Sequence, residues 1–404
     1  MYRVSPFVRH FGLALLAGIA IATLWLTLSP SGYYDAMEWR LVEVPLPGWI
    51  APYPLALTPL VVVSDALMAL FFFFIAKEFW EALRLKRGAL SGQRGALPLS
   101  AMIGGWVGAV LMWLAAGALF ETAIEASTGA GWPLPFGSDV VLCYLVGRLI
   151  FGNGHPALHL LLLITIANDI FGLIVVGIAY PAAGLRLAWL AMSVLALAVV
   201  WLGFGRLARP GASERDHARA LGLWPYVVAG VVCWLGVVLA GLPGALGLVP
   251  LVVVMPHADR AFGLFAEAEE FLQDPLNRLA HLLVKPLAVV LFLFGLTQGG
   301  VDFLALAPTT GTVLAAMWLG KPLGVMLGAW GAARVLGLAL PQGVAARDMV
   351  VIALITGMGF TVPVLALHSA LPGGGMAEAA RLGLVLSLLA GFGAVVTARV
   401  LRRA

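Results

Sequence analysis

Pro133-Leu-Pro-Phe-Gly-Ser-Asp139 and, shortly after it, Ala167-Asn-Asp169 place two carboxylates inside strongly apolar sequence. A charged side chain near the bilayer centre costs roughly 2.5–3.5 kcal/mol on insertion scales, so an acid at that depth is a functional-site hypothesis by default. Pro and Gly oppose a continuous helix. The first stretch therefore predicts an unwound entry, with a short helix beginning near Ser138 or Asp139.

The composition is that of a membrane protein. The chain has 404 residues, of which 62% are hydrophobic and 11% charged, whereas a soluble domain carries about 25% charged residues. Cys143 and Cys233 both fall in apolar runs and do not predict a disulfide framework. The apolar run 11–28 lacks a small-residue cleavage box and predicts a first transmembrane helix. We expect one all-α integral membrane domain over residues 1–404.

Segments of about 20 mainly apolar residues predict twelve membrane spans. They lie near 11–29, 57–82, 97–119, 134–149, 156–178, 183–204, 222–240, 243–256, 279–298, 311–331, 348–369 and 380–399. With this count, 19 of the 24 Lys and Arg residues fall on the side that holds both termini, which predicts cytoplasmic termini. Two longer connections remain: an external loop or hairpin at 30–56 and a cytoplasmic loop at 257–278, which carries an acidic cluster.

The two acids are predicted to lie at one depth. Asp139 precedes Arg148 by nine residues, so at the helical rise it lies ~14 Å from the cytoplasmic end of its span. Asp169 lies 12 residues into the next span, ~18 Å deep. Because consecutive spans run antiparallel, the two carboxylates can meet near the midplane.

A matching interruption occurs in the second half of the chain. Thr356-Gly-Met-Gly-Phe-Thr-Val-Pro363 breaks the eleventh span, and the tenth carries Lys321 within Gly320-Lys-Pro-Leu-Gly324. Broken spans at corresponding positions of two halves are typical of inverted-repeat transporters. Half-helix ends carry partial charges of about ±0.5, which carboxylates and an ammonium can balance.

The chain resembles the NhaA-type bacterial sodium/proton antiporters from about residue 10 to 400. The segments that carry the resemblance are Ser64-Asp-Ala-Leu-Met-Ala-Leu-Phe-Phe, Gly131-Trp with Ser138-Asp139, Ala167-Asn-Asp169, Gly320-Lys-Pro-Leu-Gly324 and Gly357-Met-Gly-Phe-Thr361. The resemblance implies twelve helices with crossing, interrupted fourth and eleventh helices. It also implies a homodimer held partly by the external loop after the first span.

By position, the resemblance implies the following site. The second acid of the family's Asp-Asp pair falls on Asp169, and Asn168 replaces the first. The aspartate of the fourth span falls on Asp139, Ser138 stands where the family has threonine, and the family lysine falls on Lys321.

Two glutamates are candidates for pH regulation. The cytoplasmic glutamate of the family's second span falls on Glu78, whereas Glu81 replaces a family arginine and Lys77 enters an apolar position. Lys77 and Glu81 are spaced to form an i, i+4 pair. The sequence leaves open whether this group is a plain salt bridge or a regulatory cluster.

The expected function is exchange of sodium or lithium for protons by alternating access in a bacterial inner membrane. Asp169 is the predicted shared cation and proton site, with Asp139 as helper and as metal ligand to the transported ion. Asn168 and Ser138 are predicted neutral oxygen donors, and Lys321 is the charge-compensating residue. Because Asn cannot titrate, one proton per sodium is favoured; two remain the alternative if Lys321 also loses its proton.

Other classes fit the sequence less well. An intramembrane aspartyl protease also pairs aspartates on neighbouring helices, but its Gly-x-Gly-Asp signature is absent. A passive channel would not explain the opposed breaks. A family member that has lost sodium transport, through Asn168, remains the main alternative. We expect no catalytic residues, no cofactor and no nucleic-acid binding.

Overall fold

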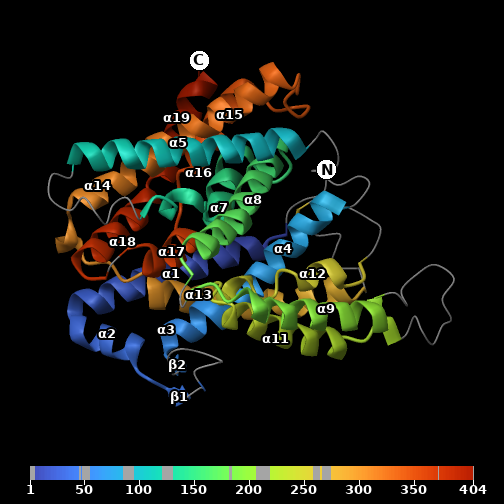
Figure 1. Cartoon of the computed structure of the whole chain (residues 1–404). Coiled ribbons are helices and arrows are strands. Elements are labelled where there is room, and N and C mark those ends of the chain that lie inside the picture. The colour runs from blue at the N-terminus through green and yellow to red at the C-terminus, as the bar shows by residue number, and fades with distance from the viewer. Residues whose placement is uncertain are drawn as a thin grey trace.

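Within the described residues, the computed structural model of the chain is almost entirely helical, with one small two-stranded sheet (Figure 1). It describes residues 5–44, 47, 55–84, 95–120, 131–181, 184–205, 219–257, 264–265, 274–371 and 373–403.

Eight described segments are long and apolar enough to cross a bilayer. They are Phe7–Leu28, Pro59–Arg84, Ala96–Leu119, Leu134–Phe151, Pro156–Ala179, Pro275–Gln298, Pro308–Val335 and Gly375–Arg402. A ninth combines α16 (Ala346–Thr356) and α17 (Thr361–Ala370), which are bent by 43°. Three shorter apolar helices are Leu187–Gly203, Trp224–Leu239 and Gly244–Val254. The predicted class, a helical multi-pass membrane protein, agrees with these elements.

These segments are built from labelled helices. Besides α16 and α17 they include α1 (Phe7–Leu28), α4 (Met68–Arg84), α5 (Ala96–Phe120), α7 (Val140–Phe151), α8 (Pro156–Ala179), α9 (Leu190–Gly203), α11 (Trp224–Leu239), α13 (Pro275–Gln298), α14 (Pro308–Ala315), α15 (Lys321–Val335), α18 (Gly375–Ser387) and α19 (Ala390–Arg403). The short elements are α2 (Pro30–Glu38), α3 (Pro59–Val61), α12 (Leu251–Val254), the π-helical turns η1 (Val62–Leu67) and η10 (Ala316–Gly320), and the 3₁₀ turns η4 (Leu134–Phe136), η5 (Leu187–Trp189), η7 (Gly244–Leu246) and η9 (Phe303–Ala305).

The two long connections are described in part. Strands β1 (Val42–Val44) and β2 (Leu55–Leu57) pair antiparallel after α2, with Val42 opposite Leu57. In the acidic connection before α13, Asp274 caps that helix by accepting from the Asn277 N–H at 3.1 Å. The other members of the acidic cluster lie outside the described residues; they are Glu267, Glu269 and Glu270.

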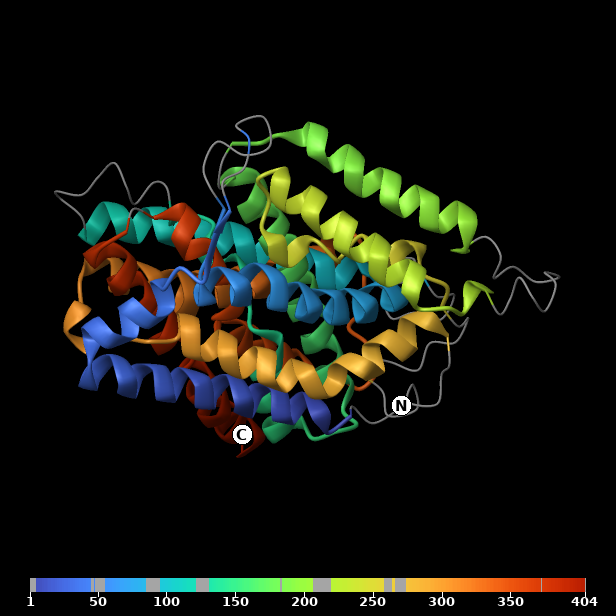
Figure 2. The ribbon, with the colours of Figure 1, turned by 90° about the horizontal axis from the view of Figure 1, so that it is seen from below.

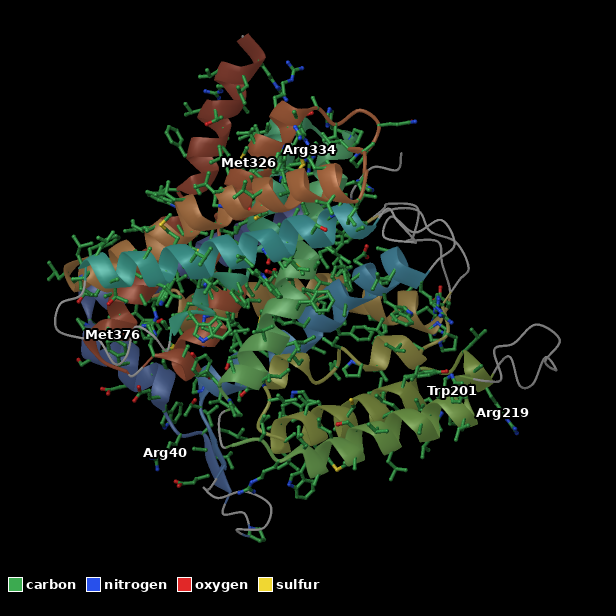
Figure 3. The ribbon with its side chains drawn as sticks, turned by 45° about the horizontal axis from the view of Figure 1, so that its top comes forward. Arg40, Trp201, Arg219, Met326, Arg334 and Met376 are labelled. Carbon is green, nitrogen blue, oxygen red and sulfur yellow. The ribbon has the colours of Figure 1, made fainter. Side chains whose placement is uncertain are left out.

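The helices pack so that α7 and α8 lie in the interior. Among the described membrane-length segments, these two are the most buried. Helix α1 packs along α13, α5 along α15, and α9 along α11 at the edge of the bundle (Figure 2). Figure 3 shows Arg40 at the lower left of the molecule and Arg219 at its right side. The polar residues of α7 and α8 are therefore enclosed by apolar helices on several sides.

Glycines let α5 and α15 touch backbone to backbone. A Cβ on Gly104 would lie 2.7 Å from the Gly328 Cα, and one on Gly108 would lie 2.8 Å from the Gly324 Cα. A Cβ on Gly324 would in turn overlap the Gly104 carbonyl oxygen. Small residues at such spacings are the usual means of close helix packing in membranes. This contact fixes the position of α15, which begins at Lys321.

Replacing Gly324 by Ala is expected to destabilise the protein by about 1–3 kcal/mol, because the added methyl has only backbone atoms to displace. Thermal melting of the purified protein in detergent measures the effect. Gly331→Ala is the matched control on the same helix, since nothing lies within 4 Å of a Cβ built there. Equal melting temperatures for the two variants would contradict the packing argument.

Candidate ion-binding site

Two breaks in helical backbone face each other inside the bundle. Residues 137–139 precede α7 without helical structure, and residues 357–360 separate α16 from α17. The backbone N–H of Asp139 donates to the Met358 carbonyl across the junction at 3.3 Å. A Cβ on Gly359 would lie 2.8 Å from the carbonyl oxygen of the facing glycine. The two breaks thus form one unit, and their close approach requires a glycine at position 359.

Asp139 ties both breaks together. The residue is fully buried, and α7 begins directly after it, one residue beyond the predicted start. Its Oδ1 accepts from the Leu142 N–H at 3.0 Å and so caps α7. Its Oδ2 accepts from the hydroxyl of Thr361, the first residue of α17. The carboxylate therefore holds the start of both half-helices, where N-terminal partial positive charge favours it.

Asp169 of α8 is fully buried and binds the same helix end. Its Oδ1 accepts from the Ser138 N–H at 2.7 Å, and its Oδ2 accepts from the Val140 N–H at 3.2 Å. Backbone N–H groups at a helix start have no intrahelical partner. Both oxygens of Asp169 supply such partners, so the interruption before α7 is what makes room for a second carboxylate.

Lys321 binds backbone carbonyl oxygens, which carry partial negative charge, whereas the two aspartates bind backbone N–H groups. It is fully buried at the junction of η10 and α15. Its Nζ donates to the carbonyl oxygens of Pro135, Phe136 and Gly137 at 2.9, 3.1 and 2.5 Å. An ammonium has three donors, and these three carbonyls at the end of η4 take all of them. The lysine compensates a half-helix carbonyl end through direct hydrogen bonds.

Asn168 lies beside Asp169 on α8 but bonds to different groups. Its Oδ1 accepts from the Trp106 indole N–H at 2.5 Å, and its Nδ2 donates to the Ser138 Oγ at 2.6 Å. The Ser138 hydroxyl donates in turn to the Thr356 carbonyl at 3.0 Å. Asn168 therefore links α5 to both breaks.

The structure brings five of the predicted site residues into one connected group. They are Ser138, Asp139, Asn168, Asp169 and Lys321, joined through the backbone of residues 135–140. Carboxylate and carbonyl oxygens are the hard ligands that alkali cations prefer. Among the described residues, no three or more His, Cys, Asp or Glu side chains cluster so as to hold a metal ion. The group therefore offers carboxylate and carbonyl oxygens of the kind that an alkali cation prefers.

Glu78 and Glu81 belong to a separate group on α4. Lys77 Nζ lies 3.1 Å from Glu78 Oε1 and 3.1 Å from Glu81 Oε2, which confirms the predicted i, i+4 pair. All three residues are buried. Glu78 Oε2 also accepts from the Phe265 N–H at 2.6 Å. Glu78 thus ties the backbone of Phe265 to α4, whereas Glu81 pairs with Lys77 within α4.

Sequence reasoning missed Thr361 and Trp106. Thr361 was included only as part of the interrupted stretch and its glycine motif and was given no role, although a hydroxyl at the start of a broken helix is a signal for capping. Trp106 lies in the apolar run of α5, and nothing in its neighbourhood marks it as different from the other twelve tryptophans of the chain. Only packing reveals its contact with Asn168.

Two buried acids and a buried lysine at opposed helix breaks, within a bundle of membrane-length helices, define a multi-pass membrane protein of the transporter class. A sequence model of the family described as Na+/H+ antiporter 1 matches residues 8–400. The chain belongs to this family.

Individual relatives align over nearly their full length. The Na(+)/H(+) antiporter NhaA of Jannaschia sp. (strain CCS1) is 39% identical over 402 residues, covering 96% of this chain and 95% of that protein. The Na(+)/H(+) antiporter NhaA of Geobacter sulfurreducens is 32% identical over 382 residues, covering 94% and 93%. That of Desulfitobacterium hafniense is 32% identical over 387 residues, covering 95% and 92%.

Replacing Lys321 by Met is expected to lower folded stability, because three buried carbonyl oxygens lose their donor and each unsatisfied group costs about 1–3 kcal/mol. Melting in detergent with and without the substitution measures the loss. Lys285→Met, at an exposed position of α13, is the control that also removes one lysine charge. If the two variants melt alike, Lys321 does not stabilise the break before α7.

Proposed function

We propose that this protein exchanges sodium or lithium ions for protons across the bacterial inner membrane by alternating access. Family membership and relatives named Na(+)/H(+) antiporters support the assignment. The observation that carries it is the fully buried Asp169 carboxylate, which is held by two backbone N–H groups beside a second buried acid. A carboxylate out of water gains from binding either a proton or a cation, so the two compete for it.

The charges of the site favour one-for-one exchange. With Asp139, Asp169 and Lys321 all ionised, the site carries one net negative charge. One sodium ion or one proton brings it to zero, and a neutral site is the easiest to move through a dry interior. Asn168 adds no titratable group. Only a loaded site then crosses between the inward-facing and outward-facing states, which couples the two fluxes.

Each neighbour of Asp169 has a proposed role. Asp139 is the second carboxylate and balances the half-helix starts. Ser138 and Asn168 are candidate neutral oxygen donors, and Lys321 compensates the carbonyl end. The group of Glu78 and Glu81 is proposed to adjust activity with pH, because these buried acids share Lys77 and Glu78 also holds the backbone N–H of Phe265. The Asn168 alternative, loss of sodium transport, has no supporting observation among the relatives.

The proposed membrane arrangement has twelve spans related by an inverted repeat. The three shorter apolar helices would complete the nine longer segments, and the breaks before α7 and between α16 and α17 would be the interruptions of the fourth and eleventh spans. Both termini are proposed to be cytoplasmic because Lys and Arg gather on that side. The segment 30–56, which includes β1 and β2, is the proposed homodimer contact.

Asp169→Asn is expected to abolish sodium-driven proton movement, since the amide keeps an acceptor for the Ser138 N–H but can neither ionise nor release a proton. Proteoliposomes loaded with a pH-sensitive dye and given a sodium pulse report the flux. Asp35→Asn, at an exposed position of α2, should exchange like the unmodified protein. Sodium/proton exchange that survives Asp169→Asn would refute the site assignment.

Exchange is expected to be electroneutral. A voltage-sensitive dye in the same proteoliposomes should report no potential after a sodium pulse, while the pH dye reports proton movement. A potassium gradient with valinomycin provides the positive control for the voltage dye. A sodium-dependent potential with the vesicle interior negative would instead establish more than one proton per sodium and would bring a second titrating group, such as Lys321, into the cycle.

A further inference from the structure

Trp106 occupies a position that touches several parts of the site at once. Its indole ring stacks on Phe136 of η4, with ring centres 4.6 Å apart and planes 3° from parallel. The preceding residue, Gly105, lies against α15: a Cβ there would be 3.6 Å from the Lys321 Cγ. Because glycine contacts fix α5 against α15, the indole is held over the break before α7.

The indole decides how the Asn168 amide is turned. An indole N–H can only donate, so the amide atom that faces it at 2.5 Å must be the oxygen. The amide nitrogen must then face Ser138, whose Oγ accepts at 2.6 Å while its O–H donates to the Thr356 carbonyl. The three hydrogen bonds run in one direction and leave a single consistent orientation.

This orientation works against cation binding by Asn168. Its carbonyl oxygen, the one part of an amide that can ligate sodium, is used by Trp106, while its NH₂ group lies toward the break that binds Asp169. Turning the oxygen toward a cation at Asp169 would break the hydrogen bonds to both Trp106 and Ser138. The indole N–H and a bound cation therefore compete for one oxygen.

We propose that Trp106 is a positioning residue that sets the sodium affinity of the site by holding the Asn168 oxygen out of cation coordination. The proposal rests on the proposed antiport function and concerns the residues around its site. It explains what Asn168 does in place of an acid. In the conformation of this structure Asn168 bridges α5 and the breaks, and it becomes a cation ligand only when its hydrogen bond to the Trp106 indole breaks.

Trp106→Phe tests the proposal, because phenylalanine retains an aromatic ring for stacking on Phe136 and lacks the N–H donor. The sodium KM of exchange should fall by about three- to tenfold, the factor that one neutral hydrogen bond is worth, with little change in maximal rate. Calorimetric titration of the purified protein with sodium should show tighter binding by a similar factor. Trp234→Phe is the matched control, since it removes an indole donor to the Asp65 carbonyl, 2.9 Å away and outside the site.

A double-mutant cycle separates positioning from general packing. In an Asn168→Ala background there is no amide oxygen to hold, so Trp106→Phe should leave the sodium KM unchanged. Effects of the two substitutions that simply add would overturn the proposal, as would a sodium KM of Trp106→Phe equal to that of the unmodified protein. Should the unmodified protein fail to exchange sodium for protons, the proposed function itself is refuted.

If Trp106→Phe does not fold, a second variant tests the same N–H donor. Benzothienylalanine at position 106 keeps the size and shape of the indole and replaces its N–H by sulfur. The same drop in sodium KM is expected, and an unchanged KM would count against the proposal.

Discussion

The whole site depends on keeping the Asp169 carboxylate satisfied without water. Its partners are two backbone N–H groups that exist only because the chain is not helical before Val140. A continuous helix there would use those groups internally and leave the acid buried and alone, at a cost that a membrane interior does not tolerate. The interruption before α7 is therefore what allows Asp169 to be buried, and Asp169 in turn stabilises the interruption.

The other polar residues follow from the same constraint. An interrupted helix exposes carbonyls as well as N–H groups, and the Lys321 ammonium takes three of these carbonyls. The facing break adds the Thr361 hydroxyl and the Met358 carbonyl to Asp139. Every contact across the junction would have to rearrange if the two breaks moved relative to each other. Charge at the site and movement of the half-helices are thus physically linked, as alternating access requires.

Much of this site could be predicted from the sequence, since Asp139 and Asp169 stand out in apolar segments and the prolines and glycines beside them mark the breaks. The partners of Lys321 and Asn168 could not. Lys321 was expected to compensate charge at the site, and its contacts with three carbonyl oxygens of a half-helix end agree with that expectation, but spacing along the chain did not say which carbonyls it would meet. Asn168 was expected to supply an oxygen to a cation, whereas Trp106 holds that oxygen. Hydrogen-bond partners depend on distances of a few tenths of an ångström between distant segments, which spacing along the chain does not encode.

The sequence by itself determined that this is a helical membrane protein with two acids inside apolar segments and two interrupted segments, because hydropathy and helix-breaking residues act locally. Only the tertiary structure decided which break meets which, and which side chain serves which helix end. It brought Gly137 and Gly359 into contact, placed the Thr361 hydroxyl on Asp139, and set α5 close enough to α8 for Trp106 to reach Asn168. These choices are made by packing across the bundle, where backbone groups without partners must be matched by whatever polar atoms the neighbouring helices present.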